Sequence, residues 1–252
     1  MWFSALGSQV PTLCAVCRSW SQDALCIDCI RSYARLSPRC PGCALPLAPG
    51  LVLCQTCAAD TERPLHTVFA RVHYAWPWTS VVASFKFKAD LSWAGEMAAM
   101  MLDTADVQDL LREADGLIPI PLARSRLVQR GYNQSWELVK QLQHRTGTPG
   151  LPDALIRRET AQLQHELSLD ERHQHAKRAL AIGPAGVRLP AGGHWVLVDD
   201  VMTTGATLRA AAQLLRDHGA RCVSGVVFAR TPSHETDANS VDPAGSAVDG
   251  ME

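Results

Sequence analysis

The run from Val196 to Thr207, VLVDDVMTTGAT, constrains the fold of this chain more than any other segment. The apolar residues 194–198 before its aspartates are typical of a strand buried in a parallel sheet. Leu208 to Arg216 has the Ala- and Leu-rich spacing of a helix. Residues 199–207 are therefore expected at the carboxyl end of a strand, where open α/β sheets bind their ligands.

Two carboxylates and a hydroxyl-rich loop occupy this strand end. The loop would present backbone N–H groups, the positive end of a helix dipole and three Thr hydroxyls, all of which suit a phosphate dianion. Asp199 and Asp200 would repel a phosphate, so they are better suited to accept hydrogen bonds from vicinal ribose hydroxyls. A pair of aspartates that only caps a helix is the alternative. The sequence thus predicts a sugar-phosphate site with Asp199 and Asp200 as catalytic residues and a phosphate loop made of Thr203, Thr204, Gly205, Ala206 and Thr207.

This run resembles the phosphoribosyl pyrophosphate (PRPP) motif of type I phosphoribosyltransferases, in which apolar residues precede Asp-Asp and Thr-Thr-Gly-Ala-Thr. The resemblance implies that a nucleophile displaces Mg²⁺-pyrophosphate at the anomeric carbon of PRPP. Asp199 and Asp200 would hold the ribose, and residues 203–207 would hold the 5′-phosphate. The acceptor cannot be identified from the sequence.

Eight of the nine cysteines form four Cys-x-x-Cys pairs in the N-terminal region. Two such pairs complete one tetrahedral all-sulfur zinc site, so we expect two structural zinc ions. Sequential pairing is the simplest scheme, an interleaved cross-brace would use the same ligands, and a redox role for four such motifs in a row is disfavoured. The predicted ligands are Cys14, Cys17, Cys26 and Cys29, and then Cys40, Cys43, Cys54 and Cys57. Cys222 stands alone in an apolar run and is expected to be a buried thiol.

Length and composition limit the class of protein. A chain of 252 residues with 47% hydrophobic residues can bury one sizeable core beside a small accessory domain. A net charge of −1 excludes a wholly basic nucleic-acid binder. No apolar run approaches the ~18 residues of a membrane span, so we expect a cytoplasmic protein without membrane insertion. The predicted domains are a double zinc ribbon (1–64), a transferase-like domain (65–232) and a disordered acidic tail (233–252).

On both sides of the Asp-Asp run, apolar segments alternate with helical ones. We expect strands over 67–75, 117–121 and 222–228, and helices over 91–102 and 135–143. The order predicts a doubly wound, mostly parallel sheet of the α/β class.

Positive charge gathers between the predicted sheet strands. From Pro121 to Arg178 there are ten Lys or Arg and six Asp or Glu, an excess of four positive charges. Arg124, Arg126 and Arg130 follow a strand end and are candidates to hold pyrophosphate, with a solvated basic face as the alternative. Residues 157–180, which include His165, His173 and His175, suit a mobile flap.

Taken together, these motifs resemble the ComF family of competence-associated phosphoribosyltransferase-like proteins over nearly the whole chain. The cysteine array, Lys86-Phe87-Lys88, Pro119-Ile120-Pro121 and the segment from Arg130 to Gln134 carry this resemblance in order and spacing. Residues 175–180 depart from it, because the family has Asn-x-x-Gly-Ala-Phe there.

The ComF resemblance implies a link to DNA uptake and leaves two functional classes. One is a PRPP-dependent transferase that uses Mg²⁺. The other is a non-catalytic protein that binds PRPP or single-stranded DNA together with competence proteins. A PRPP-responsive transcription regulator is least consistent with the sequence, which carries no helix-turn-helix signal.

Overall fold

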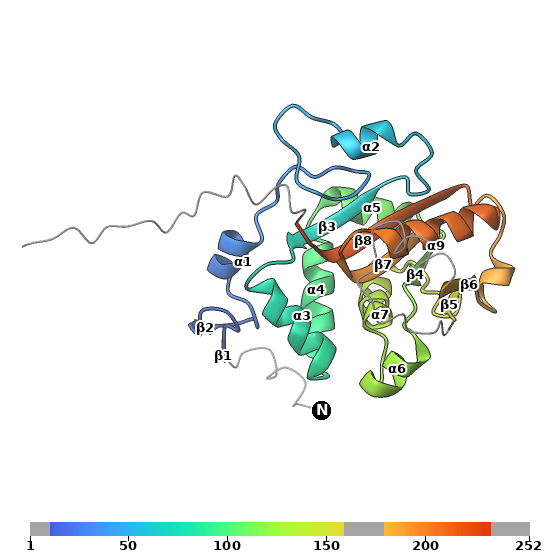
Figure 1. The fold of residues 1–252 in the computed structure, drawn as a ribbon. Helices are drawn as coiled ribbons and strands as arrows, with labels where there is room; N and C mark the ends of the chain where they lie inside the picture. The colour runs from blue at the N-terminus through green and yellow to red at the C-terminus, as the bar shows by residue number, and fades with distance from the viewer. Residues whose placement is uncertain (1–10, 159–178, 233–252) are drawn as a thin grey trace, which may run out of the picture.

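A four-stranded parallel sheet forms the centre of the protein. In the computed structural model, which describes residues 11–158 and 179–232, the strand order is β3-β8-β7-β4 and every neighbouring pair is parallel. The strands are β3 (Val68–His73), β4 (Gly116–Pro119), β7 (His194–Met202) and β8 (Cys222–Arg230) (Figure 1). The sheet confirms the predicted α/β class.

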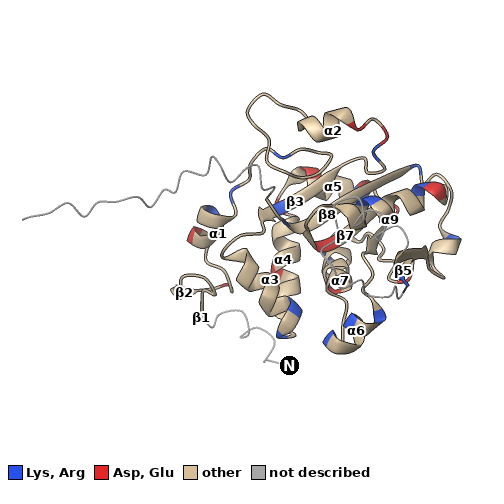
Figure 2. Cartoon of the chain, viewed as in Figure 1, with Lys and Arg blue, Asp and Glu red and all other residues tan. Residues whose placement is uncertain are grey.

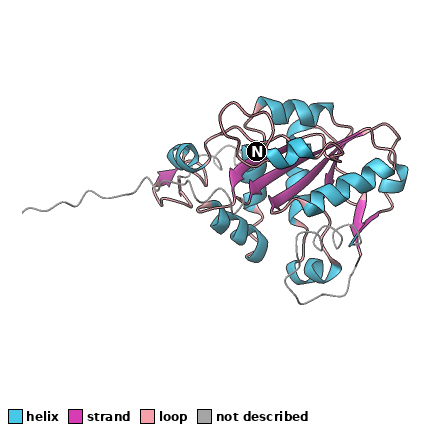
Figure 3. Ribbon diagram, turned by 45° about the horizontal axis from the view of Figure 1, so that its top comes forward, coloured by secondary structure: helices cyan, strands magenta, loops and turns pink. Residues whose placement is uncertain are grey.

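Helices cover both faces of this sheet (Figure 3). On one side lie α3 (Trp78–Phe87), α4 (Ser92–Met101), α5 (Ala105–Glu113) and α7 (Gln134–Thr146); on the other lies α9 (Ala206–Asp217). The alternation of β7 explains how one strand serves two cores. Val196 and Val198 join the core beneath α3 and α4, whereas Leu197 joins the core beneath α9.

The cysteine-rich region contributes short elements on the periphery. They are β1 (Thr12–Leu13), β2 (Trp20–Ser21), α1 (Ile27–Tyr33) and α2 (Gln55–Ala59). In Figure 1, β1, β2 and α1 lie beside α3, whereas α2 lies above the sheet. Leu25 and Ala34 pack into the core on the α3 and α4 side, and Ala44 packs into the core on the α9 side. The region is therefore docked against both faces of the sheet domain.

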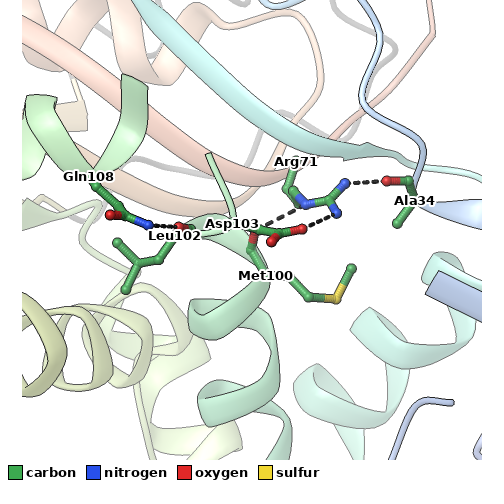
Figure 4. A network of polar contacts seen from close by, with 6 residues as sticks. All are labelled: Ala34, Arg71, Met100, Leu102, Asp103 and Gln108. Carbon is green, nitrogen blue, oxygen red and sulfur yellow. Dashed lines mark hydrogen bonds and ion pairs between the residues drawn. The ribbon is translucent and has the colours of Figure 1, made fainter. Parts of the chain in front are cut away.

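A buried arginine fastens the first part of this region to the sheet domain. Arg71 of β3 is 6% exposed, and its Nε donates to the carbonyl of Met100 at 3.0 Å. Its guanidinium also donates to the carbonyl of Ala34, just after α1, and pairs with Asp103 Oδ2 at 2.8 Å (Figure 4). One side chain thus ties the end of α1 to the end of α4.

The structure corrects several expectations. Arg124–Arg130 form the helix α6, for which no element was predicted, and α5 and the antiparallel pair β5 (Leu155–Arg157) and β6 (Leu180–Ile182) were not expected either. A short 3₁₀ turn spans Gly186–Arg188. The strand β7 continues past the aspartates to Met202, because its pairing with β8 extends to Arg230. Cys222 is partly exposed and not buried, because it is the first residue of β8, at the end of the strand.

Some predictions fall on residues that the structure does not describe. They include most of the predicted flap (159–178) and the predicted tail (233–252). In the described part of the chain, no helix is both long and apolar enough to cross a membrane. The division of the chain at residue 64 stays a prediction.

Candidate functional site

The eight N-terminal cysteines form two clusters of the same design. The first cluster consists of Cys14, Cys17, Cys26 and Cys29, the second of Cys40, Cys43, Cys54 and Cys57. In each, one pair lies on a turn and the other opens a short helix, with Cys26 and Cys54 as the N-caps of α1 and α2. Backbone N–H groups donate to sulfur in both clusters, from Cys26 to Cys14 Sγ at 3.3 Å and from Cys54 to Cys40 Sγ at 3.4 Å. Each cluster thus combines two consecutive Cys-x-x-Cys pairs, which is the sequential scheme and not the interleaved cross-brace.

The sulfur geometry of both clusters fits zinc. All four Sγ atoms of each cluster lie within 4.8 Å of one another. Cys17 and Cys26 have their Sγ atoms 3.6 Å apart, and so do Cys43 and Cys54. A tetrahedral zinc with Zn–S bonds of about 2.3 Å has sulfur–sulfur edges of about 3.8 Å, whereas a disulfide bond is about 2.05 Å long. The clusters could therefore each hold one zinc ion, with no ligand position left for water.

The paired aspartates lie at the carboxyl end of β7 in unlike environments. Asp199 Oδ1 accepts hydrogen bonds from Ser135 Oγ at 2.8 Å and from the backbone N–H of Asp200 at 2.9 Å. Burial raises the pKa of Asp199 to about 7, and the neighbouring charge of Asp200 acts in the same direction. Asp199 can thus change its protonation state near neutral pH.

Asp200 is held by a lysine from a different helix. Its side chain is almost fully buried, and its Oδ2 lies 2.8 Å from Lys86 Nζ at the end of α3. An ammonium group beside a buried carboxylate balances its negative charge. The ion pair also brings a positive charge to the mouth of the predicted ribose site.

A cavity of about 180 Å³ opens at this strand end and collects charges of both signs. Its charged and hydroxyl-bearing lining residues are Lys86, Arg126, Arg130, Ser135, Arg157, Asp199, Asp200 and Thr207. The Lys and Arg positions of α6 and of the end of α3, coloured blue, lie toward the same end of the molecule in Figure 2. The cavity therefore combines carboxylates for hydroxyl groups with cations for phosphates.

Two guanidinium groups of the cavity lie close enough to affect each other. Burial lowers the pKa of Arg157, and the charge of Arg126 lowers it further. Cations held near one another in a partly buried cavity favour the binding of a multiply charged anion. Arg126 and Arg130 line the cavity, whereas Arg124, the first residue of α6, does not.

The predicted phosphate loop, residues 203–207, turns sharply into α9. Gly205 has φ +81° and is the N-cap of α9, which begins at Ala206. The hydroxyl of Thr204 accepts from the backbone N–H of Ala206 at 3.3 Å. The loop thus presents a helix N-terminus, as predicted, but of its five residues only Thr207 lines the cavity.

Beside the cavity, an arginine lies over an exposed aromatic ring. Phe87 is 73% exposed, and the guanidinium carbon of Arg130 lies 5.1 Å from the centre of its ring. Lys86 and Lys88 flank Phe87 in the chain. An exposed ring among cations is a surface on which a planar aromatic group can stack.

Comparison with known proteins agrees with this geometry. The phosphoribosyl transferase domain family matches residues 152–245. The chain is 31% identical over 229 residues to DNA utilization protein YhgH of Salmonella typhimurium, covering 88% of this chain and 98% of that protein. The chain belongs to the ComF family. Competence protein F of Haemophilus influenzae, another similar protein, is 30% identical over 79% of this chain and 87% of its own length.

Solved structures similar to this ComF family member include two phosphoribosyltransferases. The adenine enzyme from Thermoanaerobacter pseudethanolicus is 18% identical over 58% of this chain and 83% of its own, with a TM-score of 0.33. The orotate enzyme from Aeropyrum pernix is 19% identical over 60% and 68%, with a TM-score of 0.35. Similarities of this size add nothing to the assignment of the site.

Four polar cavity residues of this ComF family member were not predicted as site residues: Lys86, Gln134, Ser135 and Arg157. Gln134 is 2% exposed, and its Nε2 has no hydrogen-bond partner among the described residues. A buried amide donor without a partner is costly, so it marks a place where a ligand oxygen can bind. Gln134 and Ser135 open α7, and a polar helix start directly after an arginine-rich segment is the sequence signal that could have identified them.

Proposed function

We propose that this protein binds PRPP and Mg²⁺ at the carboxyl end of β7 and transfers the phosphoribosyl group to an acceptor. One observation carries the proposal: Asp199 and Asp200 share a cavity with Lys86, Arg126 and Arg157, directly beside the N-terminus of α9. Carboxylates, cations and a helix N-terminus match the three parts of PRPP, which are ribose hydroxyls, pyrophosphate and 5′-phosphate.

Each part of the site has a distinct task in this proposal. Asp199 and Asp200 accept hydrogen bonds from the ribose hydroxyls, and residues 203–207 bind the 5′-phosphate. Arg126, Arg130 and Arg157 stabilise the pyrophosphate as it leaves. Mg²⁺ bound to the ligand would neutralise part of the negative charge that develops on pyrophosphate. The two zinc ions of the cysteine clusters are structural, because their ligand sets are closed.

The proposed transfer moves one group between two partners. The acceptor donates an electron pair to the anomeric carbon, the bond from that carbon to the pyrophosphate oxygen breaks, and pyrophosphate leaves with that electron pair. The acceptor then loses a proton. The residues of the site position PRPP and stabilise charge, so most of the rate enhancement would come from orientation and electrostatics. The cytoplasm, where PRPP is made and used, is the compartment we propose.

Calorimetry with PRPP and Mg²⁺ tests the binding step, and pyrophosphate release in the presence of nucleobases, nucleosides and oligonucleotides tests the transfer. We expect saturable binding of PRPP that weakens in Asp200→Asn. The absence of wild-type binding would overturn the proposal. If PRPP binds but no acceptor causes the release of pyrophosphate, the protein binds PRPP and does not act as a transferase.

A second function, the binding of single-stranded DNA, is favoured by the exposed ring of Phe87. Bases stack on exposed aromatic rings, and neighbouring cations follow the phosphate backbone. Phe87 has Arg130 over its ring and Lys86 and Lys88 beside it in the chain. The relatives named for DNA utilization and competence agree with such a partner.

Fluorescence anisotropy with a labelled oligonucleotide tests this second function. Stacking on one aromatic side chain contributes about 1–3 kcal/mol per base, so Phe87→Ala should weaken binding roughly tenfold. Exposed Trp20, which lies in the first ribbon, provides the control variant Trp20→Ala. Equal affinities of wild type and Phe87→Ala, or a loss in Trp20→Ala alone, would contradict stacking at Phe87.

A further inference from the structure

A second buried arginine, Arg230, connects the second cysteine cluster to the phosphate loop. It ends β8 and is 6% exposed. Its Nε donates to the carbonyl of Cys43, within the cluster, at 2.8 Å. Its Nη1 donates to the carbonyl of Met202 at 3.3 Å and to the carbonyl of Thr203. One guanidinium group therefore joins a metal-ligand residue to the first residue of the phosphate loop.

The strand pairing explains this position. Arg230 is opposite Met202 in the parallel register of β7 and β8, so it stands where β7 ends and the loop begins. The backbone N–H of Thr231 also donates to the carbonyl of Met202 at 3.0 Å. The start of the loop is thus fixed by the last residues of β8.

A second contact ties the other side of the loop to the same region. Arg209, in the first turn of α9, forms an ion pair with Asp60 at the end of α2. The loop lies between Met202 and α9, so both of its ends are attached to the segment that carries the second cluster. Polar contacts at both ends restrict the motion of a loop.

The positive charge of buried Arg230 is a second reason to link this residue to the second cluster. No carboxylate within residues 11–158 and 179–232 forms an ion pair with it, whereas buried Arg71 pairs with Asp103. Zinc with four thiolate ligands carries a net charge of about −2. The loaded second cluster would therefore supply the negative charge that balances this buried guanidinium.

We propose that Arg230 is a positioning residue that makes the shape of the phosphate loop depend on the metal-loaded second cluster. Among the described residues the first cluster has no such connection to the loop, because Arg71 joins Ala34, just after α1, to the end of α4 instead. The two clusters then differ in role. The first docks the ribbon, and the second also holds the loop. The expected effect on PRPP affinity rests on the proposed function, whereas the expected effect on the order of the loop does not.

Arg230→Lys and Arg71→Lys form a matched pair of variants. Both arginines are 6% exposed, and both donate to a carbonyl of the cysteine-rich region. A lysine keeps the charge but cannot bridge the same carbonyls at once. We expect Arg230→Lys to increase hydrogen exchange of the amides in residues 203–207 and to weaken PRPP binding roughly tenfold, with two zinc ions retained. Arg71→Lys should lower the melting temperature and leave PRPP affinity within about twofold.

Cys54→Ser and Cys26→Ser test the role of the metal, since these cysteines are equivalent N-caps in the two clusters. Faster exchange in residues 203–207 is expected in Cys54→Ser and not in Cys26→Ser. Unchanged loop exchange and PRPP affinity in Arg230→Lys would overturn the inference, as would an equal effect of Arg71→Lys. If wild-type protein does not bind PRPP, the proposed function fails, while the exchange data still decide whether Arg230 orders the loop.

Discussion

Lys86 Nζ lies 2.8 Å from Asp200 Oδ2, so the carboxylate assigned to a ribose hydroxyl already has a cationic partner. The two residues come from α3 and β7, and the Asp200 side chain is more buried than that of Lys86. PRPP must share or take over this carboxylate. When PRPP binds, the ammonium group of Lys86 can contact a phosphate oxygen. Lys86 would then pair with Asp200 in the free protein and with PRPP in the complex.

We expect Lys86→Met to lower both stability and PRPP affinity. Removing one partner of a buried ion pair leaves an uncompensated charge, at a cost of about 3 kcal/mol. Lys88→Met is the control, because Lys88 is exposed two residues away and should cost less than about 0.5 kcal/mol. Urea unfolding and calorimetry measure the two effects. Equal behaviour of the two variants would show that the ion pair does not stabilise the site.

The pKa of Asp199 predicts how stability depends on pH. Because the folded-state pKa is raised to about 7 from 3.8, the native protein keeps this proton in a range where the unfolded chain has lost it. The contribution of Asp199 to the free energy of unfolding therefore falls as pH rises through this range and levels off above about pH 7.

Asp199→Asn should remove this decline. The variant keeps the shape of the side chain and stays neutral, so it should be more stable than wild type at pH 8 by about 1–3 kcal/mol, with a smaller difference at pH 5.5. Urea unfolding at both pH values measures the difference, and Asp153→Asn, at an exposed aspartate, controls for general charge effects. Parallel pH profiles of wild type and Asp199→Asn would refute the assignment.

Metal analysis of purified protein should give about two zinc ions per chain. Cys40→Ser should lose one of them and loosen the second cluster, because Cys40 is fully buried and its sulfur accepts a backbone N–H. Cys222→Ser should retain both, since Cys222 lies outside the clusters. A metal-free wild type in which these cysteines form disulfides would contradict the prediction.

The sequence predicted those helices and strands whose buried face is visible in the pattern of their own apolar residues. The continuous apolar run around Val196 identified β7, and the Ala- and Leu-rich spacing after Thr207 identified α9, because each element's own sequence shows which residues it buries. The helix α5 carries the same kind of signal in Val107, Leu110 and Leu111, all buried, and was missed although its spacing is helical. The helix α6 could not be recognised this way, since none of its residues is buried.

The contacts that complete the site join distant parts of the chain. Lys86 meets Asp200 and Ser135 meets Asp199 only after the sheet brings α3, α7 and β7 together. Arg230 contacts Cys43 across 187 positions of sequence. No spacing rule relates such residues in a single sequence. The motif therefore identified the strand end, and the tertiary fold determined which cations reach it.

The arginines of the cavity should differ in their effect on PRPP binding. Arg126 and Arg157 line the cavity and Arg124 does not. A hydrogen bond to a charged group contributes about 1.5–3 kcal/mol, so Arg126→Gln and Arg157→Gln should each weaken binding roughly ten- to hundredfold. Arg124→Gln should bind as wild type does. Calorimetry at two salt concentrations separates contact from general charge, and a loss in Arg124→Gln equal to the others would support a diffuse basic face.

The backbone of the phosphate loop gives the last prediction. Gly205 and Gly192 both have φ +81°, a conformation that costs an L-residue about 1–2 kcal/mol. A Cβ at Gly192 meets nothing within 4 Å, whereas a Cβ at Gly205 would lie 2.4 Å from Cε of buried Met202. Gly192→Ala should therefore lower the stability of the protein and leave its PRPP affinity unchanged.

Gly205→Ala should lose about as much stability and should also bind PRPP at least about tenfold more weakly, because its methyl group must displace Met202 at the start of the loop. Thermal unfolding together with calorimetry measures both quantities for each variant. PRPP affinity that is unchanged in Gly205→Ala would mean that the 5′-phosphate does not depend on the shape of this turn, and the binding site would then have to lie on the α6 side of the cavity.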